Sequence, residues 1–296
     1  MKIIRHPKKK KLKGCVVALG TFDGVHLGHQ KVINTAARYA IRNKVSSLAI
    51  TFDPHPQQLI VPERGLKLLT TLKEREDLFG ELGVDGVVLV RFTQQMRKLS
   101  YQQFVKKYLV DLLGVSRVFV GYDYAFGKKR AGGVEQLKAL GKKYGFTVAV
   151  IPAARIGWQI VKSSKIRELI SQGKFNRAVK LLNRPYVITG KVVKGTGEGK
   201  VLGFPTANLK TDPHKLIPAH GVYAGRVGEH KAAVNIGSRP TFGVGGSVVE
   251  VHLLGYQGNL YGQTIKVELT RRLRDEKQFS DVEKLKKQIK QDVSRL

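Results

Sequence analysis

The stretch GCVVALGTFDGVHLGHQ (residues 14–30) combines an apolar run, a glycine-rich turn and the start of a helical pattern. The apolar run is rich in valine, as in strands that are buried on both faces. Three glycines then interrupt the pattern, and an amphipathic periodicity follows them. Two histidines, His26 and His29, lie at this transition. The stretch therefore predicts a strand–turn–helix unit with two imidazoles at its turn.

Four further apolar runs repeat this rhythm in the first half of the chain. They are SLAITF, GVVLV, RVFVG and TVAVI, at residues 47–52, 86–90, 117–121 and 147–151. Helical patterns separate the runs. In residues 28–42, one helical face would comprise Val32, Ile33, Ala36, Ala37, Ala40 and Ile41. Alternating strands and helices predict a parallel sheet covered by helices, whose ligands bind beyond the carboxyl ends of the strands.

The second half of the chain has a different period. A helix predicted from about Ser164 to Leu182 ends before Pro185, because proline cannot continue it. Five strand-like segments follow, with glycine-rich turns and no helix between them: YVITGKVVKG, GVYAGRVG, KAAVNIG, VVEVHLLGY and TIKVELTRRL. Such a run predicts an antiparallel barrel or sandwich. We place the boundary near Pro185, which gives domains 1–184 and 185–296.

An amphipathic helix closes the chain. Ser280 and Glu283 form the pattern of a capping box, which predicts that the helix begins at Ser280. One apolar stripe comprises Val282, Leu285, Ile289, Val293 and Leu296.

Composition restricts the possible classes of protein. The 296 residues suffice for two ordinary domains, and no apolar run is long enough to span a membrane. Cys15 is the single cysteine and cannot form an internal disulfide, so we expect a cytoplasmic protein without a secretory signal. The net charge is +31, which favours contact with polyanions. Most lysines are scattered, as on a solvated surface, and nucleic-acid binding remains an alternative.

The residues themselves leave three interpretations of His26 and His29: zinc ligands, packed side chains, or groups that act on phosphate. Structural zinc needs four ligands, and no Cys or His cluster completes such a set. A helix beginning near Gly28 would direct backbone N–H groups and a positive dipole toward an anion such as a nucleoside triphosphate. Imidazoles there can donate hydrogen bonds that stabilise the charge developing at a phosphorus centre. The pattern favours phosphate chemistry.

The segment GTFDGVHLGH resembles the G-x-F-D-G-x-H-x-G-H signature of the nucleotidyltransferase superfamily. The segments TFDPHP (51–56), GYDYAFGKKRAGG (121–133) and VKSSKIRELI (161–170) follow at family-like intervals. Together the four motifs are similar to the FMN adenylyltransferase module of bacterial bifunctional riboflavin kinase/FAD synthetases. This resemblance implies a Rossmann-like domain with a parallel sheet, in which the phosphate of FMN attacks the α-phosphorus of ATP and releases pyrophosphate.

The same resemblance implies roles for single residues. His26 and His29 would contact the ATP phosphates and stabilise the transition state, with no covalent intermediate. Asp123 and Arg130 would bind the flavin. Further ATP contacts would come from Gly20, Phe22, Asp23, Gly28, Ser163, Ser164 and Arg167.

Three positions depart from the family pattern. Lys162 and Ser164 replace a serine and a threonine, and Gly133 replaces an aspartate. A lysine beside a triphosphate is chemically compatible, since it adds positive charge. The missing carboxylate at position 133 matters if it organises the loop or a metal ion.

The glycine-rich stretch KGTGEGKVLGFPTANL (194–209) does not have the spacing of a P-loop. Lys194 occupies the place of the first glycine, and Val201 replaces the required Ser or Thr. A glycine-rich hairpin is therefore the simpler interpretation of its first part. In the extended part, Thr206 and Asn208 project to the same side. Their hydroxyl and amide oxygens are ligands that magnesium accepts.

Alternation in VVEVHLL places Glu250 and His252 opposite Val249 and Val251. By pattern alone, Glu250 is either a general base or a carboxylate that faces solvent.

The segment LGFPTANL resembles the P-T-A-N motif of riboflavin kinases. Four later segments are also similar to that family: GVYAG (221–225), NIGSRPTFG (235–243), VEVHLLGYQGNLYG (249–262) and LRDEKQF (273–279). This resemblance implies an antiparallel β-barrel kinase domain with a terminal helix. Thr206 and Asn208 would hold Mg2+, Glu250 would deprotonate the 5′-hydroxyl of riboflavin, and Arg274 would contact the flavin. ATP would bind to Gly195, Gly197, Lys200, Gly203 and Pro205.

The expectation from sequence is a cytoplasmic α/β bifunctional enzyme that converts riboflavin to FMN and FMN to FAD with ATP and Mg2+. It requires no membrane and no specific nucleic acid, and the sequence is compatible with a homo-oligomer. Two alternatives remain: a riboflavin kinase whose first domain is inactive or has another acceptor, and a basic nucleic-acid-binding protein that retains the enzyme fold.

Overall fold

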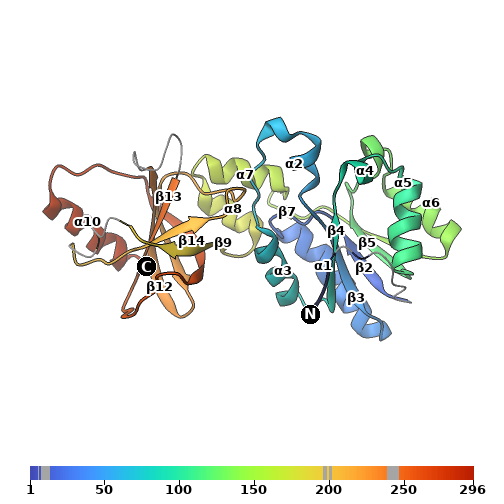
Figure 1. Ribbon diagram of the computed structural model, residues 1–296, viewed down its shortest axis with the longest axis horizontal. Helices are drawn as coiled ribbons and strands as arrows, with labels where there is room; N and C mark the ends of the chain where they lie inside the picture. The colour runs from blue at the N-terminus through green and yellow to red at the C-terminus, as the bar shows by residue number, and fades with distance from the viewer. Residues whose placement is uncertain (6, 8–13, 196–198, 200–201, 239–246) are drawn as a thin grey trace. The chain divides into compact units, whose positions relative to one another are not determined.

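The computed structural model of the chain describes residues 1–5, 7, 14–195, 199, 202–238 and 247–296 (Figure 1). These residues form two compact units. The first comprises Met1–Lys67 and Leu72–Lys162, and the second comprises Leu68–Thr71 and Ser163–Leu296.

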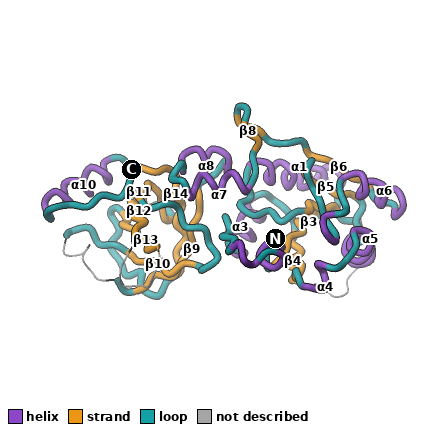
Figure 2. The backbone as a smooth tube through the Cα atoms, turned by 90° about the horizontal axis from the view of Figure 1, so that it is seen from above, coloured by secondary structure: helices purple, strands orange, loops and turns teal. Residues whose placement is uncertain are grey.

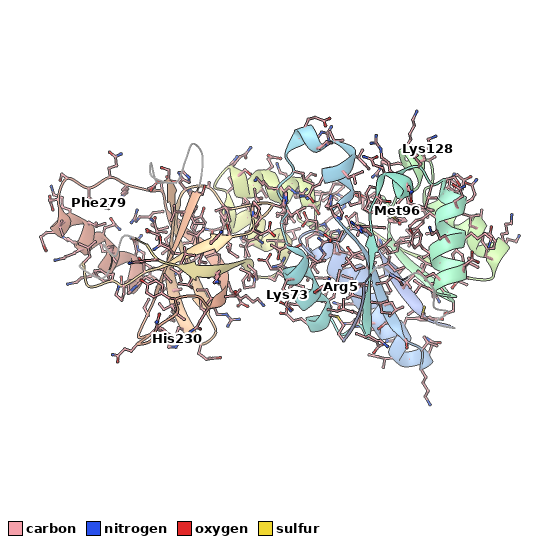
Figure 3. All side chains as sticks on the ribbon, viewed as in Figure 1. Arg5, Lys73, Met96, Lys128, His230 and Phe279 are labelled. Carbon is pink, nitrogen blue, oxygen red and sulfur yellow. The ribbon has the colours of Figure 1, made fainter. Side chains whose placement is uncertain are left out.

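A parallel sheet in the order β1-β4-β3-β2-β5-β6 forms the centre of the first unit. Its strands are β1 (Lys2–Arg5), β2 (Val16–Leu19), β3 (Ser47–Asp53), β4 (Gly86–Arg91), β5 (Arg117–Gly121) and β6 (Thr147–Ile151). The five expected strands are confirmed. Strand β1 was not predicted; it pairs in parallel with β4. An ion pair of 2.8 Å between Arg5 Nη2 and Glu76 Oε1 holds it there (Arg5 is labelled in Figure 3).

The chain order of the sheet reverses beside β2. Strands β2, β3 and β4 follow one another toward one edge, whereas β5 pairs with the other side of β2. In open α/β sheets, ligands bind outside the carboxyl ends of the strands at such a reversal. The turn after β2 leaves the sheet at this point, as the sequence predicted.

Helices cover both faces of the sheet. On one face, α1 (Leu27–Asn43) and α3 (Leu72–Glu81) pack with Val16 and Ala18. On the other, α5 (Tyr101–Phe104), the π-helix η2 (Val105–Leu112) and α6 (Val134–Tyr144) pack with Val17 and Leu19. Burial on both faces explains why β2 is apolar throughout. The shorter elements are α2 (Pro56–Ile60), η1 (Pro62–Arg64), α4 (Gln94–Arg97), η3 (Lys128–Arg130), β7 (Arg155–Ile156) and β8 (Gln159–Ile160).

The buried face of α1 differs from the predicted face at one position. Five of the six expected residues are buried, but Ile41 is 75% exposed. Each residue turns the helix by about 100°, so Ile41 lies beyond the edge of the face that ends at Ala40. The prediction for Ile41 was wrong.

Two helices replace the single helix predicted over residues 164–182. They are α7 (Ser163–Ser171) and α8 (Phe175–Leu182). Gly173 separates them with a φ of +71°, and a Cβ there would lie 2.9 Å from Arg272 Nη1. Both helices belong to the second compact unit, so the packing division falls after Lys162. The sequence boundary at Pro185 marks instead where helices give way to strands.

A closed antiparallel barrel forms the body of the second unit, in the order β10-β13-β12-β11-β14-β9 (Figure 2). Pairing of β9 with β10 closes it. The strands are β9 (Tyr186–Val193), β10 (Ala207–Thr211), β11 (Gly221–Val227), β12 (His230–Ser238), β13 (Ser247–Leu253) and β14 (Thr264–Arg274). The predicted barrel is confirmed, and β10 adds to the five expected strands. Buried core side chains include Ile188, Leu209, Tyr223, Val234, Val251 and Val267.

Helix α10 (Val282–Ser294) is the predicted terminal helix, but its cap differs. Asp281, not Ser280, is the N-cap, and its Oδ1 accepts from the backbone N–H of Lys284 at 2.8 Å. This hydrogen bond lowers the pKa of Asp281. Ser280 lies one residue too early, and its hydroxyl donates to Asp281 Oδ2. Val282 was expected in the buried stripe but is 53% exposed.

A short strap from the first half of the sequence, Leu68–Thr71, packs into the second unit. Leu68 exchanges backbone hydrogen bonds with His214 and Leu216. The buried Lys215 donates from Nζ to the Leu69 carbonyl at 2.7 Å, and its ammonium lies 4.3 Å from the centre of the Tyr186 ring. In the part of the chain that the structure describes, no helix is long and apolar enough to cross a membrane.

Candidate active sites

The turn between β2 and α1 has an unusual backbone. Phe22 and Val25 have φ values of +52° and +39°, in the region that side chains other than glycine rarely adopt. Both side chains are buried in the core beneath α1. A Cβ on Gly20 would lie 2.9 Å from the Phe22 ring. Packing therefore holds a strained turn at the strand end, as is common at functional sites.

His26 and His29 lie together at the start of α1. Their rings stack with centroids 3.6 Å apart and an interplanar angle of 19°. His26 is buried and is the N-cap of the helix, where its Nδ1 accepts from the His29 backbone N–H at 3.3 Å. Because Nδ1 accepts, the proton of the neutral His26 ring is on Nε2. The Phe22 ring contacts His29 edge-on at 5.3 Å.

Glycine at position 28 allows the histidines to pack closely. A Cβ there would lie 3.2 Å from His26 Cε1 and 3.7 Å from the Cβ of Ala154. The backbone N–H groups of Leu27 and Gly28 lie at the N-terminus of a helix of 17 residues, whereas that of His29 donates to the His26 ring. The turn thus offers two imidazoles and a helix N-terminus on one side of the sheet.

Arg75 lies behind this turn and was not predicted from sequence. It is 1% exposed, and its Nη1 donates to the Thr21 carbonyl and to Thr51 Oγ1, both at 2.9 Å. Burial lowers the pKa of Arg75, while the nearby charges of Asp23, Asp53 and Glu76 act in the opposite direction. The signal was present in KEREDLF, where Arg75 shares a helical face with Leu78 and Phe79.

The predicted flavin residues Asp123 and Arg130 lie on the loop after β5, the neighbour of β2. Both are exposed, and Arg130 has a φ of +60°. Tyr124 and Phe126 stack with ring centroids 5.3 Å apart on the same loop. Burial raises the pKa of Tyr124. These aromatic side chains give the loop a packed base from which Asp123 and Arg130 reach solvent.

Gly133, where the family pattern has aspartate, is the N-cap of α6. Its N–H donates to Gln136 Oε1 at 3.0 Å. Glycine is tolerated at this position, so the missing carboxylate leaves the helix start intact.

Ser163, Ser164 and Arg167 belong to the second compact unit, apart from the unit that contains the two histidines. The serines form the first turn of α7, and Arg167 follows one turn later. Ser163 and Arg167 are half-buried, whereas Ser164 is exposed. The arrangement places two hydroxyls and a guanidinium near one helix N-terminus, as phosphate binding requires.

A pocket of about 370 Å³ lies on the outer side of the barrel. Its polar lining includes Thr206, Asn208, Asn235, Glu250 and His252. Val249 and Val251 are buried while Glu250 and His252 are half-buried, so the alternation inferred from sequence is as predicted.

Three polar residues form a row across neighbouring strands. Asn208 of β10 pairs with Glu250 of β13, and Glu250 pairs with Asn235 of β12. Asn235 Nδ2 donates to Glu250 Oε2 at 3.3 Å. Directly opposite residues have their Cβ atoms about 4.5–5.5 Å apart, so the amide of Asn208 and the carboxylate of Glu250 face one small volume.

The glycine-rich segment before β10 packs against these residues. A Cβ on Gly195 would overlap the Asn208 amide, and one on Gly199 would lie 2.9 Å from Thr206 Oγ1. Gly203 turns the chain with a φ of +85°. Pro205 accepts a 2.9 Å hydrogen bond from His252 Nδ1 at its carbonyl. The remaining predicted ATP contacts, Gly197 and Lys200, lie outside the described residues.

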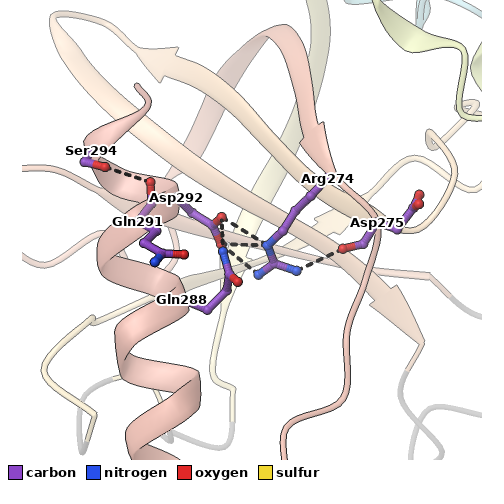
Figure 4. Close-up of polar contacts among 6 residues, drawn as sticks. All are labelled: Arg274, Asp275, Gln288, Gln291, Asp292 and Ser294. Atoms are coloured by element: carbon purple, nitrogen blue, oxygen red, sulfur yellow. Dashed lines mark hydrogen bonds and ion pairs between the residues drawn. The ribbon is translucent and has the colours of Figure 1, made fainter.

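Arg274, predicted to contact the flavin, also lines the pocket. Figure 4 shows its guanidinium against the carboxylate of Asp292 on α10. Asp292 was not predicted as a site residue; the only sequence signal was a charged residue one position before Val293 of the apolar stripe.

Among the described residues, no three His, Cys, Asp or Glu side chains are grouped so that they could hold a metal ion. Thr206, Asn208 and Glu250 offer only oxygen ligands, which suit Mg2+ when ATP phosphates complete the coordination.

Comparisons with known proteins cover both units. The FAD synthetase family model matches residues 8–165, and the riboflavin kinase model matches residues 182–296. A bifunctional riboflavin kinase/FMN adenylyltransferase from Pseudomonas fluorescens is 36% identical over 99% of this chain and 96% of its own length. The enzyme of the same name from Listeria monocytogenes is 37% identical over 94% of this chain and 90% of its own.

A solved structure from Streptococcus pneumoniae, described as a macrolide-efflux protein, supports the fold. It superposes with a TM-score of 0.88 at 28% identity, covering 99% of this chain and 98% of that one. The two matched families and the near full-length relatives agree with the two sites of the structure. The chain belongs to the family of bifunctional riboflavin kinase/FMN adenylyltransferases, which phosphorylate riboflavin to FMN and adenylylate FMN to FAD with ATP.

Proposed function

We propose that riboflavin phosphorylation takes place in the barrel pocket, with Glu250 as the general base. The row Asn208–Glu250–Asn235 is the observation that carries this proposal. Glu250 takes the proton of the 5′-hydroxyl, the hydroxyl oxygen forms a bond to the γ-phosphorus of ATP, and ADP leaves. The Asn235 amide, which donates to Glu250 Oε2, keeps the other carboxylate oxygen turned toward the substrate.

Thr206 and Asn208 would hold Mg2+ through their side-chain oxygens. The ion neutralises charge on the transferring phosphate, which is the main requirement of phosphoryl transfer. Gly195, Gly197, Lys200, Gly203 and Pro205 would surround the phosphates of ATP. The close approach of Gly195 to Asn208 supports this assignment, because a larger residue would displace the proposed ligand.

The apolar side of the same pocket would hold the flavin ring. Val248, Phe279, Leu285 and Ile289 line it, and Arg274 lies at its edge. A planar aromatic ring system needs such a surface, with a few polar groups that fix its orientation.

FMN adenylylation would take place beyond the carboxyl ends of β2 and β5. His26 Nε2–H and the His29 ring would donate to oxygens of the ATP phosphates while the FMN phosphate attacks the α-phosphorus and pyrophosphate leaves. The N-terminus of α1 adds a positive dipole there. Gly20, Phe22, Asp23 and Gly28 would shape this ATP site.

Other contacts of this step rest on the sequence motifs. Ser163, Ser164 and Arg167 would bind phosphate, and Asp123 and Arg130 would bind FMN. We assign residues 1–184 to the adenylyltransferase and 185–296 to the kinase.

The setting of the enzyme is also inferred. We place it in the cytoplasm, where a reducing medium suits its buried, unpaired Cys15. We assign the excess of lysine to solvated surface, and not to specific nucleic-acid binding.

Two reciprocal variants test the assignment of both sites. Glu250→Gln keeps the size of the side chain but removes its basicity, so riboflavin phosphorylation should fall by roughly 100- to 10,000-fold. Its conversion of supplied FMN to FAD should continue at the normal rate. His29→Ala should instead lower FMN adenylylation by roughly 100-fold or more and leave phosphorylation intact.

Purified variants are incubated with Mg-ATP and either riboflavin or FMN, and the flavins are separated by chromatography. Loss of both activities in both variants would contradict the assignment to separate sites. Normal phosphorylation by Glu250→Gln would show that Glu250 is not the base.

A further inference from the structure

Helix α10 forms part of the wall of the barrel pocket that the row Asn208–Glu250–Asn235 also lines. Leu285, Ile289 and Asp292 of this helix line the pocket. Phe279, on the segment that leads into the helix, continues the same wall and is labelled in Figure 3. The apolar surface available to a flavin ring therefore depends on where α10 lies relative to the barrel.

A buried ion pair joins α10 to the barrel. Arg274 Nε lies 3.0 Å from each carboxylate oxygen of Asp292, and Nη2 donates to Oδ2 at 2.7 Å (Figure 4). Arg274 Nη1 donates to the Asp275 carbonyl, and Gln288 Nε2 donates to Asp292 Oδ1. The side chains of Arg274 and Asp292 are only 13% and 4% exposed.

The other contacts of α10 hold it less firmly. Leu285 and Ile289 are half-buried, and of the residues described in α10 only Asp292 is buried. Lys231 and Arg271 donate to carbonyls at the end of the chain, but these contacts are exposed. Exposed polar contacts contribute little to stability, so the Arg274–Asp292 pair is the strongest of these polar constraints on the helix position.

A two-pronged ion pair restricts the orientation of its two elements more than apolar packing does. A buried ion pair is often no more stabilising than apolar side chains of the same volume, because both charges lose their hydration. The planar guanidinium, however, accepts a carboxylate in only a few orientations. The pair therefore fixes how far α10 slides and turns on the barrel, and with it the positions of Leu285 and Ile289.

We propose that Asp292 is a positioning residue for riboflavin binding, which acts by holding Arg274 and so fixing α10 against the flavin ring. This inference rests on the proposed function of the pocket as the riboflavin site. Loss of the pair would allow α10 to shift, and its apolar side chains with it. Thr206, Asn208 and Glu250 would keep their positions on the barrel. Binding of the flavin would weaken, and binding of ATP and the chemical step would change little.

Asp292→Asn tests the proposal in the full-length protein. The KM for riboflavin should rise at least about 10-fold, as when a buried charge pair loses one partner. The KM for ATP, the kcat at saturating riboflavin and the adenylylation of FMN should stay within about two-fold of normal. Glu283→Gln is the matched control. It removes a carboxylate from the same helix, paired with Lys286 at the surface, and should change none of these constants.

A purely structural role would lower kcat through a smaller active fraction and leave the KM for riboflavin unchanged. That result would overturn the proposal. If Asp292→Asn does not accumulate as folded protein, Asp292→Glu decides, because it keeps the negative charge but its longer side chain misplaces the carboxylate for the two-pronged contact with Arg274. A raised KM for riboflavin in that variant supports the proposal, and a normal KM contradicts it.

The proposed function is checked separately by Glu250→Gln. If that variant loses phosphorylation but the KM for riboflavin is normal in Asp292→Asn, only the positioning role fails. If Glu250→Gln phosphorylates riboflavin normally, the assignment of the pocket fails as well.

Discussion

Replacement of Arg75 by methionine tests whether this buried side chain holds the adenylyltransferase turn. Methionine has a similar length but no charge and no donors. The change removes two full hydrogen bonds, to the Thr21 carbonyl and Thr51 Oγ1, each of 2.9 Å. It also removes the positive charge that interacts with the carboxylates of Asp23, Asp53 and Glu76, of which Asp23 is buried.

The magnitude follows from the hydrogen bonds of Arg75. Hydrogen bonds to a charged group contribute about 1.5–3 kcal/mol each, so the loss of two should cost about 3–5 kcal/mol of unfolding free energy. For a unit of this size the midpoint of thermal unfolding should fall by roughly 6–20 °C. At a temperature where the variant is still folded, FMN adenylylation should fall by on the order of 100-fold, since small displacements of reacting groups have effects of that size. Riboflavin phosphorylation should remain normal.

Both quantities can be measured on one preparation, by thermal unfolding and by the conversion of FMN to FAD. Arg97→Met is the matched control, because Arg97 is exposed on α4 and should tolerate the change. Unfolding within 2 °C of normal at about the normal adenylylation rate would refute the role of Arg75.

Two further substitutions and the unchanged Cys15 give distinct predictions. Gly195→Ala should displace the Asn208 amide and lower phosphorylation by on the order of 100-fold, with a raised requirement for Mg2+ and normal adenylylation. Gly133→Asp should stabilise α6 by a few tenths of a kcal/mol and leave adenylylation within about two-fold, as thermal unfolding and the FMN assay would show. Burial raises the pKa of Cys15 from 9.0 to about 11, so native protein at pH 8 should react with a thiol reagent only after unfolding. Because the folded state holds this proton more tightly, the unfolding free energy should fall as pH rises from 9.0 to about 11. Rapid labelling of native protein, a normal kinase in Gly195→Ala, or loss of adenylylation in Gly133→Asp would contradict the respective prediction.

Periodicity predicted those parts of the fold that depend on local pattern. Strand β2 is apolar at every position because helices cover both faces of its sheet, whereas β13 alternates because only one face enters the barrel core. The alternation alone placed Glu250 on the side that proved to line the pocket. The glycine-rich turn after β2 likewise indicated the strand end where the two histidines meet.

The remaining features depend on partners far away in the sequence. Strand β1 is only four residues long and is fixed by β4 and by Glu76, which its own residues KIIR do not reveal. At Gly173, where the helix breaks with a φ of +71°, a Cβ would lie 2.9 Å from Nη1 of Arg272, a residue 99 positions later, and the helical pattern on both sides does not reveal this contact. Asn235 lies beside Glu250 only because β12 pairs with β13.

Each proposed site has an arginine beside it that sequence reasoning missed or assigned to another role. Arg75 holds the turn that carries His26 and His29, and Arg274 holds the helix that faces Glu250. An apolar side chain in either place would offer no donors, so it would not define the direction of a backbone carbonyl or the rotation of a helix. Phosphoryl and adenylyl transfer depend on positioning more than on covalent chemistry by the protein. Burial removes part of the hydration of both arginines. Their hydrogen bonds give the turn and the pocket wall one orientation each, and transfer requires such fixed positions.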